Sequence, residues 1–141
     1  MQRFNIRAVF VGSLLMLAVD ILSSILLFSV FGGDALTAGA TQDEITAVAK
    51  IVEQNDGYLW AGVLLGTFST VMGGYIAARM AKHLPLFNAF AVGVVGITAA
   101  VLLADGSSES PAWFSFFGYI STLPAAILGG WLARRELKQG A

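Results

Sequence analysis

The sequence contains no cysteine and a single histidine, His83, among its 141 residues. Without cysteine, the chain can form neither a disulfide nor a thiolate metal site. One histidine, placed beside Lys82, supplies neither the paired ligands of a metal centre nor a catalytic dyad. We therefore expect no metal, no cofactor and no enzyme activity, because a nucleophile, acid and base are not present as a set.

Charge is also scarce: 12 % of the residues are charged and 57 % are hydrophobic, whereas roughly 25 % of a typical soluble domain is charged. A net charge of −1 offers no basic footprint for nucleic acid. Four apolar stretches cover residues 8–31, 57–78, 84–104 and 111–133. Each is near the roughly 20 residues that cross a lipid bilayer. The sequence predicts one all-α domain over residues 1–141, a four-transmembrane-helix bundle.

Basic residues predict the orientation of these spans, because Lys and Arg are enriched in cytoplasmic loops. All but one of the Lys and Arg residues flank the same side: Arg3, Arg7, Arg79, Lys82, Arg134, Arg135 and Lys138. The opposite loops carry Lys50 and an excess of Asp and Glu. We expect a chain that inserts in one direction only, with both termini in the cytoplasm. This bias argues against dual-topology channels and transporters.

The loop between the first two spans predicts a short amphipathic helix over about 42–54 on the outer side. Thr41 and Glu44 have the spacing of a capping box, in which each side chain satisfies a backbone amide of the first turn. Ile45, Val48 and Ile51 recur at helical spacing. The apolar stripe is expected to rest on the membrane or to cap the bundle, and docking of a partner protein is the alternative.

Small residues recur every four positions within the spans, which is typical of membrane helices that pack closely. The glycines assigned to helix packing are Gly62, Gly66, Gly74, Gly96, Gly118 and Gly130. Packing within one chain is the simpler interpretation. A homo-oligomer interface is the alternative.

Two segments share the pattern Gly-Gly-aromatic-aliphatic-Ala-x-Arg, GGYIAAR at 73–79 and GGWLARR at 129–135. A parallel internal repeat explains the match, and so does separate selection for packing residues and membrane anchors. The first segment, with the turn containing Pro85 and NAFAVG at 88–93, resembles a pattern in uncharacterised small four-helix inner-membrane proteins of bacteria. The resemblance implies the architecture and a bacterial inner membrane. It carries no activity and no site residues.

Asp20 is the one acidic residue inside an apolar span. A charge at such depth costs about 2.5–3.5 kcal/mol on insertion scales, so Asp20 should face the bundle interior or a water-filled cavity. No Lys or Arg lies at a comparable depth to form an ion pair, which leaves hydroxyl groups as partners. The candidate ligand- or proton-binding set is Asp20, Ser23, Ser24, Thr67, Thr70 and Thr122, with Ser69 and Ser121 at similar depth.

Two functions remain open at this point. The first is a non-enzymatic subunit, scaffold or assembly protein that contacts another membrane protein through its small-residue faces and outer helix. The second is a small proton- or ion-coupled transporter or channel that uses Asp20. We expect the first, because Asp20 alone indicates a substrate site, and a neutral Asp20 that bonds hydroxyls would only stabilise packing. A dry, packed Asp20 would favour the first function, and a cavity that reaches Asp20 would favour the second.

Overall fold

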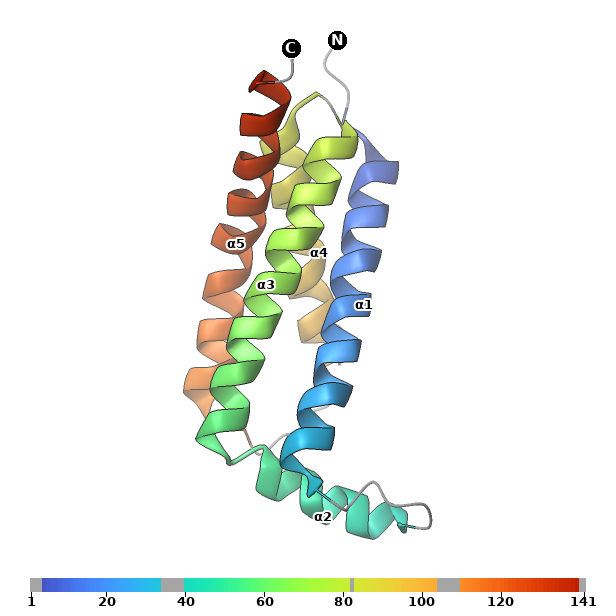
Figure 1. Ribbon diagram of the computed structural model, residues 1–141, viewed down its shortest axis with the longest axis vertical. Coiled ribbons are helices and arrows are strands. Elements are labelled where there is room, and N and C mark those ends of the chain that lie inside the picture. Colours follow the sequence, from blue (N-terminus) through green and yellow to red (C-terminus); the bar gives the residue numbers. More distant parts are fainter. Residues whose placement is uncertain (1–3, 34–39, 82, 104–109, 140–141) are drawn as a thin grey trace.

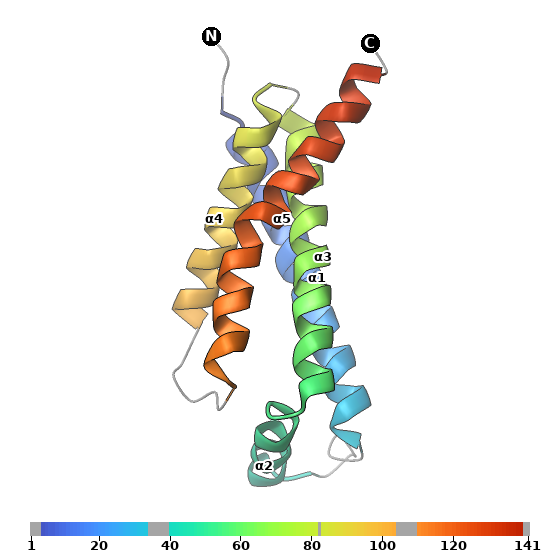
Figure 2. The same ribbon diagram turned by 90° about the vertical axis from the view of Figure 1, so that its left-hand side faces the viewer.

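The computed structural model describes residues 4–33, 40–81, 83–103 and 110–139. Within these ranges the helices are α1 (Ile6–Phe31), α2 (Gln42–Val52), α3 (Asp56–Ala81), α4 (Pro85–Leu103) and α5 (Ala112–Gln139). The four long helices form a bundle, and α2 lies across one end of it (Figures 1 and 2). We call this the α2 end. The start of α1 and the end of α5 both lie at the opposite end, which we call the terminal end.

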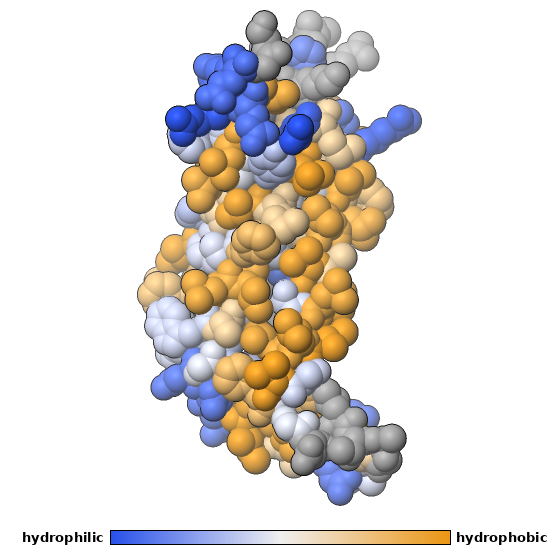
Figure 3. Space-filling view, in the orientation of Figure 1, coloured by the Kyte–Doolittle hydropathy of each residue, from blue (hydrophilic) through white to orange (hydrophobic). Residues whose placement is uncertain are grey.

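The four long helices are each long and apolar enough to cross a membrane, which confirms the predicted all-α, four-span architecture. Figure 3 shows an apolar band over the middle of one face, with hydrophilic residues toward both ends. Large apolar side chains of α1 point outward: Phe10, Leu22 and Val30 are each at least 60 % exposed. Such a surface is suited to lipid and unsuited to water.

The helix bounds differ most from the predicted spans at α5, which continues past residue 133 to Gln139. The added turns contain Arg134, Arg135 and Glu136, which are good helix formers. Hydropathy marks where the apolar segment ends, whereas the backbone helix continues as long as the residues favour it.

The short helix predicted after the first span is α2, and its capping box is confirmed. The backbone N–H of Thr41 donates to Glu44 Oε2 at 2.7 Å, and the N–H of Glu44 donates to Thr41 Oγ1 at 3.3 Å. The hydrogen bonds from the Thr41 backbone and hydroxyl hold the pKa of the Glu44 carboxyl below its ordinary value. The helix ends at Val52 rather than near 54, and the Asn55 side chain instead caps α3 by accepting from the Tyr58 N–H.

The terminal half of the bundle is held by backbone contact between α3 and α5. A Cβ added at Gly129 would lie 2.1 Å from the Val71 carbonyl oxygen, and one at Gly74 would lie 2.3 Å from the Ala126 carbonyl oxygen. Real Cβ atoms essentially never come within 3.0 Å of another atom in this way. Only glycine therefore permits this crossing.

The other two helices approach this crossing just as closely. A Cβ at Gly12 of α1 would lie 2.5 Å from the Gly73 carbonyl oxygen, and one at Gly130 would lie 2.5 Å from Ala89 Cβ of α4. The first Gly-Gly pair of the repeated pattern thus faces α1, α4 and α5, and the second pair faces α3 and α4. The similarity between the two segments has a packing explanation, whether or not they share an origin.

A buried amide ties the terminal end together. Asn88 of α4 is fully buried, and its Oδ1 accepts from the Asn5 backbone N–H at 3.1 Å. Its Nδ2 donates to the Leu84 carbonyl at 2.9 Å and to the His83 carbonyl at 3.2 Å. One side chain therefore joins the start of α1 to the turn before α4.

Toward the α2 end the helices separate, and α4 and α5 lean away from α1 and α3 (Figure 2). Helix α5 bends near its middle in the same view and contains Pro124. Proline has no N–H to donate, so the Ile120 carbonyl lacks its usual helical partner. The bend lies between the part of α5 that packs on α3 and the part that leans away.

Candidate functional site

A cavity of about 630 Å³ lies between α1, α3, α4 and α5 in the half of the bundle nearer the α2 end. Most of its wall is apolar, and Met16, Ile21, Leu103 and Phe114 contribute to it. Its polar lining consists of Asp20, Ser24, Thr67, Ser115, Tyr119, Ser121 and Thr122. Pockets for small organic ligands typically enclose about 300–1,000 Å³ and combine an apolar wall with a few polar groups.

Two of the glycines assigned to packing line this cavity instead. A Cβ at Gly66 or at Gly118 would meet no described atom of another helix within 4 Å, so the expected helix contacts are absent there from the part of the chain that the structure describes. The separation of the helix pairs moves the neighbouring backbones out of reach. Gly62 and Gly96 also line the cavity, and their added Cβ atoms would meet only side chains, of Phe114 at 3.6 Å and of Met16 at 2.9 Å.

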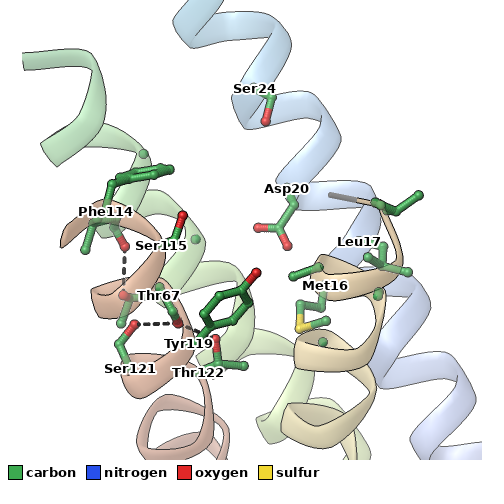
Figure 4. A pocket seen from close by; sticks show the side chains of 18 of the residues that line it. Met16, Leu17, Asp20, Ser24, Thr67, Phe114, Ser115, Tyr119, Ser121 and Thr122 are labelled. Carbon is green, nitrogen blue, oxygen red and sulfur yellow. Dashed lines mark hydrogen bonds between the residues drawn. The ribbon is translucent and has the colours of Figure 1, made fainter. Parts of the chain in front are cut away.

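Asp20 lies on the wall of the cavity, one helical turn nearer the α2 end than Met16, and points into it (Figure 4). Its side chain is partly buried and faces the bundle interior, as the insertion cost of an intramembrane acid requires. The Ser69 hydroxyl of α3 donates a hydrogen bond to Asp20 Oδ1. Asp20 thus has one firm protein partner and an open side toward the cavity.

Ser69 allows this contact to persist in either protonation state of Asp20. The Ser69 oxygen also lies 2.9 Å from the Gly66 carbonyl, but a hydroxyl has only one hydrogen to donate. When Asp20 is charged, Ser69 donates to the carboxylate. When Asp20 is protonated, the carboxyl can donate to Ser69, and Ser69 can donate to the Gly66 carbonyl. The pair can therefore gain or lose a proton without losing the hydrogen bond between α1 and α3.

The other predicted site residues separate into two groups. Ser24, Thr67 and Thr122 line the same cavity as Asp20, so the structure brings these together. Thr70 is buried and donates to the Gly66 carbonyl at 2.8 Å, and it lies outside the cavity lining, as does Ser23. Helical rotation explains the difference, since neighbours in sequence point about 100° apart around a helix.

The hydroxyl hydrogens of three lining residues are already in use. Thr67 donates to the Val63 carbonyl at 2.7 Å, Thr122 to the Gly118 carbonyl at 2.7 Å and Ser121 to the same carbonyl at 3.2 Å. Such bonds to the preceding helical turn are common for Ser and Thr in membrane helices. Each hydroxyl then offers a ligand only its oxygen lone pairs.

Phe114, Ser115 and Tyr119 also line the cavity but were absent from the predicted site. Figure 4 shows the Tyr119 ring lying across the cavity from Asp20. Ser115, Gly118 and Thr122 recur at intervals of three and four, and Tyr119 belongs to the same face. This periodicity in the sequence is a signal that would have found the polar face of α5.

Within the described residues, no group of three or more His, Asp or Glu side chains is placed to hold a metal ion. The site consists of one carboxyl group, several hydroxyls and an apolar wall. Such a site can bind a ligand and exchange a proton. No protein-family model, curated protein or solved structure matches this chain.

Proposed function

We propose that the protein binds a small, largely hydrophobic ligand within the membrane and exchanges it for a proton at Asp20, as a small proton-coupled carrier does. The observation that supports this function is the position of Asp20 on the wall of a cavity of about 630 Å³. An acid retained only for packing would lie among the closely packed helices of the terminal half. Asp20 instead borders open space and has a partner that accommodates both protonation states.

The difference between the two ends of the bundle also supports a carrier. A carrier exposes its site to one side of the membrane at a time, while contacts on the other side close the path. Here the cavity extends from Asp20 toward the α2 end, and the glycine contacts of α3 and α5 close the path toward the terminal end. The arrangement fits one of the two states that such a cycle requires.

Proton-linked flux in proteoliposomes tests the proposal. Vesicles containing the pH dye pyranine would be exposed to three probes of equal skeleton, 4-phenylbutylammonium, 4-phenylbutanol and 4-phenylbutyrate. We expect at least one probe to change the internal pH beyond its effect on protein-free vesicles. Asp20→Asn should abolish the change because the amide cannot release a proton, and Ser23→Ala, outside the cavity lining, should preserve it. If no probe moves the pH in wild-type vesicles, the carrier function is wrong.

A non-enzymatic assembly role is the second candidate, favoured by the uncontacted Gly66 and Gly118. Glycines on a membrane helix allow a helix of another protein to pack closely. In that case the groove would hold a partner helix or a second copy of this chain. Cross-linking in native membranes would then recover the same partner repeatedly, and Gly66→Leu or Gly118→Leu would abolish its recovery.

We further propose that the protein lies in a bacterial inner membrane with both termini in the cytoplasm and α2 outside. Cationic Arg79, Arg134 and Arg135 lie on the terminal sides of α3 and α5, whereas Asp43 and Glu44 begin α2. The resemblance to small bacterial membrane proteins supports the same location. Because the chain lacks cysteine, single cysteines at Gln42 and Gln139 can be labelled selectively. They should react from opposite sides of the membrane, and reaction from one side would exclude this topology.

A further inference from the structure

The hydrogen-bonding character of the cavity identifies the chemical class of its ligand. The carboxylate of Asp20 accepts hydrogen bonds, and Thr67, Ser121 and Thr122 present lone pairs because their hydrogens bind helix carbonyls. Among the described residues, no Lys, Arg or His lines the cavity. The remaining lining hydroxyls can either donate or accept. The cavity therefore favours a ligand group that donates hydrogen bonds and carries positive charge.

The acceptors lie on several helices around the cavity. Asp20 belongs to α1, Thr67 to α3, and Thr122 to α5. An ammonium group has three N–H donors and no acceptor, so it matches such a set. A ligand carboxylate would meet the Asp20 charge and find no cationic partner. Beside the Asp20 carboxylate, a group that only accepts would find its donors among Ser24, Ser115 and Tyr119 of the described lining.

The apolar wall determines where the rest of the ligand lies. The lining residues of α1 extend from Met16 to Ile25, a distance of about 13 Å along the helix axis. Beyond Asp20, toward the α2 end, the wall contains Ile25, Leu103 and Phe114. A head group at Asp20 would therefore continue into an apolar body directed toward the α2 end.

We propose that the ligand is a hydrophobic amine whose ammonium group binds the Asp20 carboxylate, in a cavity whose further acceptors include Thr67 and Thr122. This inference rests on the proposed function of the cavity and specifies its substrate class. Where Asp20 is protonated before binding, one ammonium ion replaces one proton, which leaves to water, so the charge of the site is unchanged. The Ser69 hydrogen then turns from the Gly66 carbonyl to the Asp20 carboxylate.

Calorimetry in nanodiscs tests the class of ligand with the same three probes, which differ only in their polar end. We expect 4-phenylbutylammonium to bind at least about tenfold more tightly than 4-phenylbutanol, because it forms an ion pair in a medium of low dielectric constant. Binding of 4-phenylbutyrate should not exceed its partition into empty nanodiscs. Proton release on amine binding, measured in buffers of different ionisation enthalpy, should approach one per ligand below the pH at which Asp20 ionises.

Two variants at Asp20 test whether the charge of this side chain determines the preference for the amine in a protein that remains folded. Asp20→Asn should remove the preference for the amine over the alcohol, whereas Asp20→Glu should retain it. Thermal unfolding of both variants establishes that they are folded. If the wild type binds amine and alcohol equally, or binds the acid more tightly, the assignment of the ligand as an amine is wrong. The proposal that the cavity binds a small hydrophobic ligand would be retained. If no probe binds above empty nanodiscs, both proposals fail.

Discussion

The two halves of the bundle contain the same kinds of small residues but use them for opposite purposes. In the terminal half, Gly74 and Gly129 allow helix backbones to touch. In the half near the α2 end, Gly66 and Gly118 lie on the same two helices but face a cavity. A glycine on a membrane helix therefore permits either close contact with a neighbouring helix or a cavity beside it. The relative directions of the helices decide which of the two results.

The distribution of buried residues shows where close helix packing ends and the cavity begins. All the buried residues of α5, from Ala125 to Ala133, follow Pro124, and those of α4, from Asn88 to Gly93, belong to its first half. The terminal half therefore supplies most of the contacts that stabilise the fold, whereas the half near the α2 end retains unfilled volume that a ligand can occupy.

The largest difference is expected between two glycines of α5. Gly129→Ala should lower the unfolding free energy by about 3 kcal/mol, because its Cβ would collide with the rigid backbone of α3. Gly118→Ala should change stability by less than about 1 kcal/mol, the difference in helix propensity. Thermal or denaturant unfolding in detergent micelles would measure both. Gly74→Ala and Gly66→Ala provide the same pair on α3, and equal tolerance within either pair would contradict the division into two halves.

A smaller loss is expected from removing the buried amide of the terminal end. Asn88→Ala removes the acceptor of the Asn5 N–H and the side-chain donor to the His83 and Leu84 carbonyls, and should cost about 2 kcal/mol. Asn55→Ala, which removes an exposed helix cap near the α2 end, should cost at most about 1 kcal/mol. Unfolding measurements on both variants give the comparison directly. A larger cost at Asn55 would mean that the α2 end contributes more to stability than its packing indicates.

Filling the cavity should affect binding far more than stability. Gly66→Leu places a large side chain where a Cβ meets nothing within 4 Å, so the protein should remain folded while probe affinity falls by about tenfold or more. Leu64→Met, on the exposed face of α3, serves as the control and should leave affinity unchanged. Calorimetry with the phenylbutyl probes reports the result. Undiminished binding to Gly66→Leu would place the ligand elsewhere.

The smallest expected effect concerns the cap of α2, because both capping side chains are exposed. Since hydrogen bonds from Thr41 lower the Glu44 pKa, the stabilisation is present above the ordinary pKa of a Glu. It is lost as the pH falls through the lowered value. NMR amide shifts of the first turn of α2 should follow this titration. Thr41→Ala should weaken this pH dependence, because the hydroxyl bond to Glu44 is lost and the backbone bond remains. Thr46→Ala, whose hydroxyl binds the Gln42 carbonyl, should retain it in full.

Hydropathy and cap chemistry are local properties, and they predicted the spans and the start of α2 well. The inward direction of Asp20 was also predictable, because insertion cost depends on depth alone. Its hydrogen bond to Ser69 in particular was not predictable, because it depends on the rotation and axial offset of α3 against α1. The open sides of Gly66 and Gly118 were missed for a related reason. Helix divergence is a property of the whole bundle, whereas glycines that touch a neighbouring helix and glycines that face the cavity recur at the same four-residue intervals in the sequence.

Pro124 has a mechanical consequence for the bundle. The part of α5 beyond it extends about 12 residues toward Ala112, which gives a lever about 18 Å long. A change of about 10° in the bend would swing the tip by about 3 Å, close to the radius of a methylene chain with its van der Waals surface. The bend would pivot next to Ala125 and Ala126, which are buried in the terminal half. The mouth of the cavity can thus widen or narrow by about 3 Å while the backbone contacts at Gly74 and Gly129, beyond the bend, stay in place.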